Sequence, residues 1–133
     1  MSQENVEVVR RCYEFWADRD FSTFHEVADP GIVIDVSRNV FNPEVFRGLD
    51  GFRVFVEGVD EVWDDFEIKP EEFIDAGDNV VVTGRISGKG RDSGVPASMR
   101  HFAVWTLREG KVVRCVGGYS DRAEALEAAG LRG

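Results

Sequence analysis

Three polar side chains stand at positions where they could carry acid–base chemistry. Asp35 follows the apolar run that begins at Ile32, and a carboxylate among β-branched apolar side chains is a candidate for acid–base chemistry. His101 has the side chain whose charge changes nearest to neutral pH, and Tyr119 has a hydroxyl that can donate to a ligand oxygen. Together these residue types suit proton transfer without a metal.

Each of these residues also has a structural interpretation. Asp35 could accept a hydrogen bond from neighbouring backbone at the end of a strand. His101, next to Arg100 and Phe102, could be a hydrogen-bonded structural residue, and Tyr119 could satisfy its hydroxyl on a nearby carbonyl or on water. The sequence leaves both interpretations open.

Tryptophans and cysteines are candidates for the walls of an apolar chamber. Trp16, Trp63 and Trp105 are either core residues or walls of a ligand pocket. Cys12 and Cys115 lie far apart without redox or metal spacing, so each is interpreted as a small apolar side chain. Because the cysteines look reduced and no basic and apolar leader opens the chain, we expect a cytoplasmic location.

No motif for a metal or an organic cofactor occurs in the sequence. His25 and His101 lie far apart, and the acidic stretch from Glu57 to Asp75 matches no calcium-loop pattern. Phosphate-cradling and dinucleotide-binding glycine motifs are also missing. We therefore expect neither a metal nor a cofactor.

The chain of 133 residues is acidic, with 16 Lys and Arg against 25 Asp and Glu and a net charge of −9. This charge repels phosphate backbones and anionic lipids, and no apolar run could span a bilayer, so nucleic-acid and membrane partners are not expected. Residues 1–78 carry 7 basic and 20 acidic side chains, whereas residues 79–133 carry 9 and 5. The two halves should attract each other within the fold or across a dimer.

Hydrophobic periodicity predicts helices first and strands later. Ser2 is a candidate cap for an N-terminal helix, a turn is expected at 29–31, and Asp50 and Asp121 are expected to cap later helices. The sequence predicts helices to about residue 18 and over 21–28, 51–63 and 121–131, a loop over 37–43, and strands over 32–36, 66–68, 72–74, 80–86, 99–107 and 112–119.

This order predicts one α+β domain over residues 1–133, in which helices cover one face of a strongly curved, mostly antiparallel sheet. The curved sheet and its helices form a cone whose open end is a deep apolar pocket. Strand alternation puts His101, Ala103, Trp105 and Leu107 on one face, and Cys115, Gly117 and Tyr119 on one face of the next strand.

Five segments carry a family resemblance: Glu4–Arg11, Phe46–Gly51, Glu71–Asp78, Val104–Lys111 and Glu124–Leu131. In this order they resemble the SnoaL-like branch of the nuclear-transport-factor-2-like superfamily and cover most of the chain. The resemblance implies a cone-shaped α+β barrel and a homodimer packed through the outer sheet face. It is weaker for function, because the superfamily hosts isomerases, hydrolases, polyketide cyclases and non-catalytic modules.

The resemblance also implies roles for single residues. Asp35 matches the base of the ketosteroid isomerases, whereas Cys12 and Ala103 stand where those enzymes have their two oxyanion donors, with Tyr13 one residue off the inner face. Gly117 stands where limonene epoxide hydrolases and SnoaL-type cyclases keep an acid. The implied pocket brings Asp35, His101 and Tyr119 together, with Cys12, Trp16, Trp63, Ala103, Trp105, Cys115 and Gly117 around them.

Two functions are compatible with these residues. In the first, the protein binds a mostly apolar small molecule, a polyketide-, terpenoid- or steroid-like carbonyl compound, and carries out isomerase- or cyclase-type proton transfer with Asp35 as the base. In the alternative, it is a catalytically silent ligand-binding or dimerisation module, because the two donors and the last-strand acid are replaced. The variant Asp35→Asn separates the two.

Overall fold

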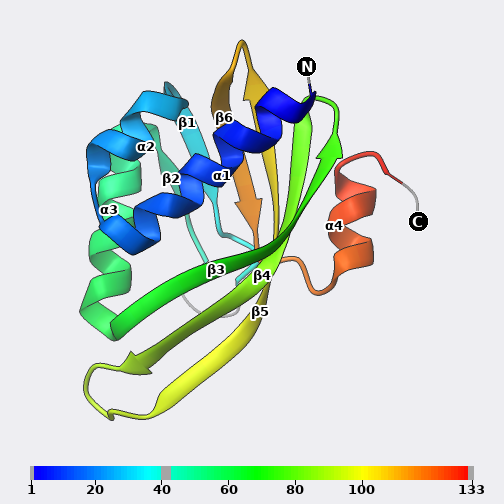
Figure 1. Ribbon diagram of the computed structural model, residues 1–133. Coiled ribbons are helices and arrows are strands. Elements are labelled where there is room, and N and C mark those ends of the chain that lie inside the picture. Colours follow the sequence, from blue (N-terminus) through cyan, green and yellow to red (C-terminus); the bar gives the residue numbers. More distant parts are fainter. Residues whose placement is uncertain (1, 40–42, 132–133) are drawn as a thin grey trace.

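The computed structural model describes residues 2–39 and 43–131. Six strands form one curved sheet in the order β2-β1-β6-β5-β4-β3, which does not close into a barrel (Figure 1). Neighbouring strands are antiparallel except β1 and β6, which run parallel. The elements are α1 (Ser2–Asp18), α2 (Phe21–Val27), β1 (Ala28–Asp35), β2 (Val45–Arg47), α3 (Gly48–Val62), β3 (Trp63–Ala76), β4 (Asn79–Gly90), β5 (Pro96–Arg108), β6 (Lys111–Gly117) and α4 (Arg122–Ala128).

The main core lies between the concave face of the sheet and the helices α1, α2 and α3. Helical spacing brings Val9 and Phe15 of α1 onto this face, where both are fully buried. Phe24 of α2 stacks on Phe52 of α3 with ring centroids 3.8 Å apart. The expected mixed α+β fold with a curved, mostly antiparallel sheet is confirmed.

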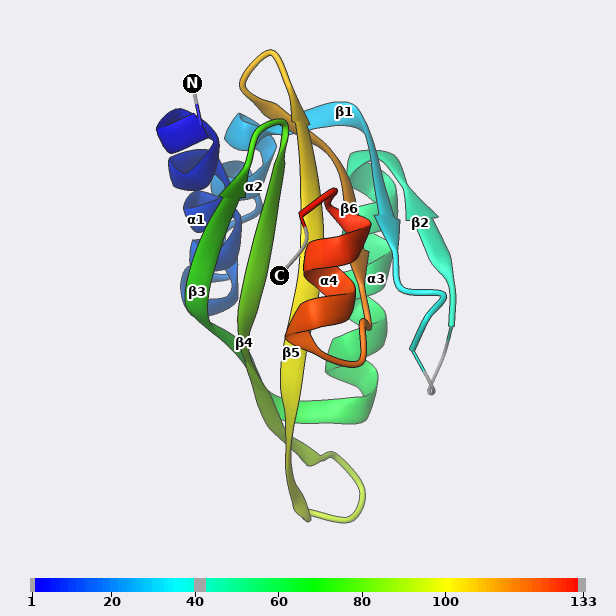
Figure 2. The ribbon, with the colours of Figure 1, turned by 90° about the vertical axis from the view of Figure 1, so that its right-hand side faces the viewer.

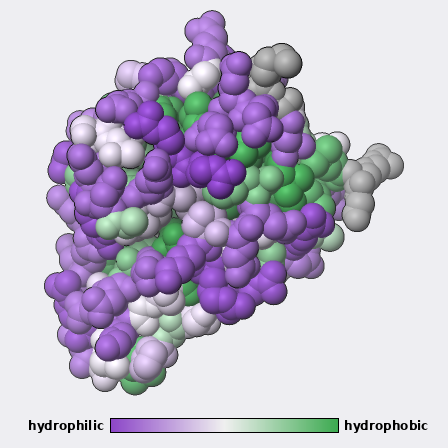
Figure 3. Space-filling view, viewed as in Figure 1, coloured by the Kyte–Doolittle hydropathy of each residue, from purple (hydrophilic) through white to green (hydrophobic). Residues whose placement is uncertain are grey.

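The helix α4 covers part of the convex face (Figure 2). Its Leu126 belongs to a second apolar cluster with Phe102 and Val104 of β5. Asp121 caps α4 as expected, because its side chain accepts a hydrogen bond from the backbone N–H of Glu124. In the view of Figure 3, hydrophilic side chains cover most of the surface and a hydrophobic patch lies near α4.

Several element boundaries differ from the prediction. The two strands expected around residue 70 form the single strand β3, whose register shifts between Asp64 and Glu67 and between Pro70 and Glu72. The turn expected at 29–31 is a register shift inside β1. The strand β2 was not predicted, because three residues are too few to show a period. The side chain of Ser2 and residues 40–42 of the expected loop lie outside the described residues.

The expectation that Asp50 caps α3 is wrong. The helix begins earlier, at Gly48, and Arg47 holds the cap position without a side-chain hydrogen bond. Asp50 therefore lies in the first turn of α3, where its charge is favourable to the helix dipole.

A hairpin arm formed by β4 and β5 extends beyond the body of the molecule (Figure 1). The two strands keep one register from the pair Asn79 and Thr106 to the pair Lys89 and Pro96. Gly84 permits β3 to bend closely over β4, since a Cβ at that position would lie 2.9 Å from Cα of Pro70.

Among the described helices none has the length and apolar content needed to cross a membrane.

Candidate functional site

A chain of three hydrogen-bonded side chains crosses the interior of the cone. The hydroxyl of Tyr13 on α1 lies 2.7 Å from Nε2 of His101 on β5, and Nε1 of Trp105 donates to the same hydroxyl at 2.9 Å. Tyr13 and Trp105 are 5% and 7% exposed. The expected inner set of β5 is confirmed for Ala103, Trp105 and Leu107, which all belong to the main core.

Burial keeps this chain neutral at pH 7. Desolvation lowers the pKa of His101 from 6.5 to about 4, because burial disfavours the imidazolium. Desolvation also raises the pKa of Tyr13 well above its ordinary value, with a further increase from neighbouring Cys115. A neutral imidazole and a neutral phenol therefore face each other.

The tautomer of His101 decides what the chain can do. If Tyr13 donates to Nε2 of His101, then Nδ1 of the ring carries the proton and serves as a donor. If Nε2 carries the proton and donates to Tyr13, the phenol can donate onward and Nδ1 becomes a free base. In either tautomer one donor remains for the oxygen of a ligand. In the second tautomer Nδ1 of His101 is in addition a proton acceptor beside that donor.

Two buried cysteines near this chain are uncharged. Cys12 and Cys115 are buried, and desolvation raises the pKa of both, so they are thiols at neutral pH. Gly117 pairs with Ala103 in the β5–β6 ladder, and a Cβ added at this buried glycine would meet no atom within 4 Å. Gly117 therefore leaves open space on the inner face.

Asp35 lies on the opposite face of β1 from the core. Ile34 and Val36 pack into the main core, and alternation turns the side chain between them outward. Asp35 accepts hydrogen bonds from the backbone N–H of Ser37 at 3.0 Å and its hydroxyl at 2.6 Å, and pairs with Arg114 at 3.2 Å. The hydrogen bonds from Ser37 are the main reason why the pKa of this carboxyl is lowered.

Tyr119 lies with the cluster under α4. Its ring packs against that cluster, and the guanidinium of Arg38 stands 4.5 Å from the ring centroid. Partial burial raises the pKa of the phenol. The expected convergence of Asp35, His101 and Tyr119 is therefore not seen: His101 faces the cone, whereas the other two lie on the convex side.

Two of the expected wall residues lie at the periphery. Trp16 is half-buried and packs edge-on against Phe55 of α3 and Phe66 of β3, with Arg19 stacked on its ring. Trp63 begins β3 directly after α3, and its ring lies near Gly88 of the arm. Neither tryptophan contacts the hydrogen-bonded chain among the described interactions.

Tyr13 is the residue that the family resemblance misplaced. The comparison with isomerases put it off the inner face, but its side chain is buried and forms the middle of the polar chain. The signal that finds it is the helical spacing from Val6 and Val9 to Tyr13, which places the three residues on one face of α1.

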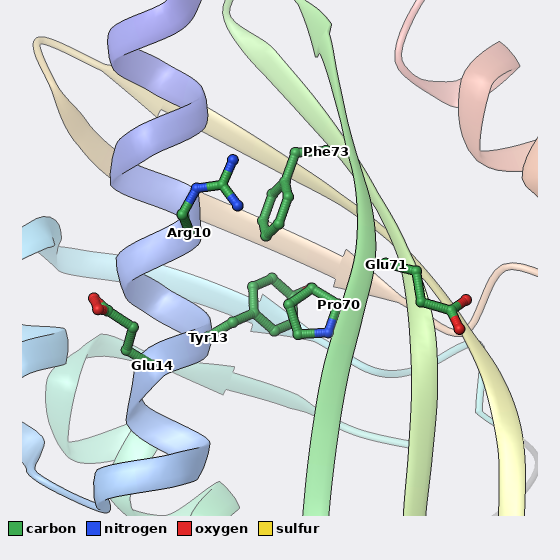
Figure 4. A pocket seen from close by; sticks show the side chains of 6 residues that line it. All are labelled: Arg10, Tyr13, Glu14, Pro70, Glu71 and Phe73. Atoms are coloured by element: carbon green, nitrogen blue, oxygen red, sulfur yellow. The ribbon is translucent and has the colours of Figure 1, made fainter.

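A groove of about 430 Å³ between α1 and β3 reaches Tyr13 from outside (Figure 4). Arg10 stacks over Phe73 at 4.5 Å along one side, while Glu71 points away from the groove in the figure. A second cavity of about 410 Å³ lies at the arm, around Ser87 and Ala97. Neither is the deep apolar pocket expected at the open end of the cone, which stays a prediction.

The curved sheet with helices on its concave face and a polar pair inside defines an α+β cone of the nuclear-transport-factor-2-like class. The chain belongs to the SnoaL-like domain family, whose sequence profile matches residues 9–115. The match covers both β5 and most of α1, so the residues of the polar chain all lie within the family domain.

Solved structures support the fold. A nuclear-transport-factor-2-like protein from Burkholderia thailandensis is 25% identical, with a TM-score of 0.79 over 93% of this chain and 95% of that chain. TerC, crystallised with polyporic acid, is 26% identical, with a TM-score of 0.77 over 86% and 89%. A protein from Jannaschia that carries the name SnoaL-like polyketide cyclase is 23% identical, with a TM-score of 0.75 over 87% and 85%. No curated protein matches the sequence.

Proposed function

We propose that this SnoaL-like domain binds an uncharged, mostly apolar small molecule inside the cone, with a ligand oxygen hydrogen-bonded to the pair Tyr13 and His101. The observation that carries the proposal is the neutral polar chain in an otherwise apolar interior. A charged ligand would lose its hydration without gaining an opposite charge there. Gly117, which pairs with Ala103, supplies space beside it.

The reaction that this arrangement supports is proton transfer next to a carbonyl group. Nδ1 of His101 takes a proton from the carbon beside the carbonyl, and the Tyr13 hydroxyl donates to the oxygen on which negative charge develops. Return of the proton to another carbon completes an isomerisation without any co-reactant. Asp35 stays the alternative base, although its carboxylate is held by Ser37 and Arg114 on the face of the sheet away from the core.

The comparisons support the ligand class. TerC, at 26% identity, was crystallised with polyporic acid, so a similar fold accommodates an organic molecule in that protein. The polyketide-, terpenoid- or steroid-like ligand expected from the sequence is likewise an organic small molecule. We extend only the binding of an organic molecule, and no particular compound, to the present chain.

A catalytically silent binding module is the second candidate. Two observations favour it: Cys12 and Ala103 replace the donors of the isomerases, and Asp35 is engaged by Ser37 and Arg114.

The expected homodimer also stays a prediction. The helix α4 covers part of the outer sheet face through which the two copies were expected to pack. Sedimentation at micromolar concentration tests the dimer.

A thermal-shift screen with uncharged apolar carbonyl compounds tests the binding proposal. A bound ligand stabilises the native state by mass action. We expect the shift to shrink in Tyr13→Phe and His101→Gln and to persist in the control Tyr119→Phe. A shift that is equal in all four proteins would contradict binding at the Tyr13–His101 pair.

Hydrogen–deuterium exchange in the bound compound separates catalysis from silent binding. In heavy water the proposed proton transfer labels the carbon next to the carbonyl, which NMR of the compound detects. Loss of labelling in His101→Gln but not in Asp35→Asn supports His101 as the base. Loss only in Asp35→Asn returns the role to Asp35, and a ligand that binds without labelling supports the silent module.

A further inference from the structure

The strand β5 has an open edge along the hairpin arm. In the described part of the chain β6 pairs with β5 only from Ala103 to Arg108, and the backbone N–H of Tyr119 donates to the carbonyl of Phe102 beyond that. From Pro96 to Arg100 every residue of β5 is exposed. Five residues of extended backbone therefore present one side to solvent.

The long outer edge of β3 is protected against pairing with another strand, whereas the open edge of β5 is not. Along β3 the register shifts twice, and Pro70 removes a backbone donor. Between β4 and β5 the register is unbroken over the whole arm. An edge without a bulge is the geometry that accepts another strand.

The direction of the backbone groups identifies the free donors. The carbonyl of Phe102 points toward the open side, whereas the N–H of Leu107 and the carbonyl of Val95 bond to the β4 side. Because backbone groups alternate along a strand, the N–H groups of Ser98 and Arg100 point toward the open edge. Both are available to an added strand without any change to the β4–β5 ladder.

The side chains beside this edge specify what would fit. Lys69, Arg85 and Arg100 form a cross-strand row on the convex face, where like charges directly opposite each other are unfavourable. Neither arginine of the row forms an ion pair with a described residue. On the other face Met99 is 61% exposed. An added strand would therefore find a cation on one side and an apolar contact on the other.

We propose that the open edge of β5 binds an extended segment of a partner protein in which acidic and apolar residues alternate. The backbone of the segment bonds to Ser98 and Arg100, its acidic side chain joins the row beside Arg100, and its apolar side chains lie next to Met99. The edge is short, so the interaction is weak and transient. This proposal does not depend on the ligand inside the cone.

Synthetic peptides test the proposal directly. The probe is a capped heptapeptide of alternating valine and glutamate, and its matched control has lysine in place of glutamate. We expect saturable binding of the glutamate peptide by calorimetry, with NMR shifts at the amides of Ser98 and Arg100. Since an exposed ion pair contributes up to about 1 kcal/mol, the lysine peptide should bind up to about fivefold more weakly for each charge that meets Arg100.

A matched pair of variants tests the edge itself. Ser98→Pro removes the free donor, whereas Ser98→Ala keeps it, so we expect a loss of affinity of up to about tenfold, and only in the proline variant. Arg100→Glu keeps the backbone and should reverse the preference in favour of the lysine peptide, which tests the proposal even if the proline variant is unstable. Equal binding of both peptides, or equal binding by both Ser98 variants, would refute it. A dimer by sedimentation that Ser98→Pro abolishes would show that a second copy, and not a partner segment, occupies the edge.

Discussion

The desolvated, partly buried imidazole of His101 makes the stability of the protein depend on pH in a defined window. In the unfolded chain the group has a pKa of 6.5, and in the folded protein desolvation lowers this pKa to about 4. Between these values the unfolded state binds the proton and the folded state does not, so the free energy of unfolding falls as the pH decreases from 6.5 to 4. A pKa difference of this size corresponds to about 3 kcal/mol.

Urea unfolding from pH 7 to pH 4 measures this contribution. Wild type should lose about 3 kcal/mol more than His101→Gln over this range, because glutamine does not titrate while carboxylates contribute equally to both proteins. His25→Gln is the matched control, since His25 is exposed on α2, and it should follow wild type. Parallel pH dependences for wild type and His101→Gln, or an imidazole NMR titration of His101 near 6.5, would refute a neutral buried histidine.

Three pairs of substitutions test hydrogen bonding, packing and backbone strain by urea unfolding. Tyr13→Phe removes a hydroxyl with two partners and should cost about 1–3 kcal/mol, whereas Tyr119→Phe should cost far less; equal costs would contradict the polar chain. Gly84→Ala should destabilise by more than about 2 kcal/mol because the Cβ meets the backbone of β3, while Gly117→Ala has open space and should be close to neutral. Arg19 has a positive φ of 55°, so Arg19→Gly should be about 1 kcal/mol more stable than Arg19→Ala, and the reverse order would exclude strain there.

Simple periodicity predicted the parts of the site that lie on regular elements. The alternation of β5 correctly placed Ala103 and Trp105 inside, because the strand keeps one register against β4. On α1 the helical spacing from Val6 and Val9 to Tyr13 indicates the buried face correctly, whereas the family resemblance placed Tyr13 one residue off it. The hydrogen bond between Tyr13 and His101 was not predictable, since it joins residues 88 positions apart whose meeting depends on how α1 crosses the sheet.

The position of Asp35 shows where a family comparison misleads. The register of β1 shifts between Ala28 and Val33, so counting from the turn does not fix which face a later residue occupies. A slip of one residue moves a side chain to the other face of a sheet. Here Val36 has the inner position, and Asp35 became a partner of Arg114 on the convex side.

The placement of α4 on its own apolar cluster makes the sheet a partition between two independently packed layers. The buried residues of the α4 cluster and those of the main core form separate sets on the two faces of the sheet. The helix can therefore separate from the sheet without exposing the main core, so its amides should exchange with solvent at a lower free energy than those of the central strands. We therefore expect the C-terminal layer to unfold locally as a separate unit, while the main core under α1, α2 and α3 stays packed.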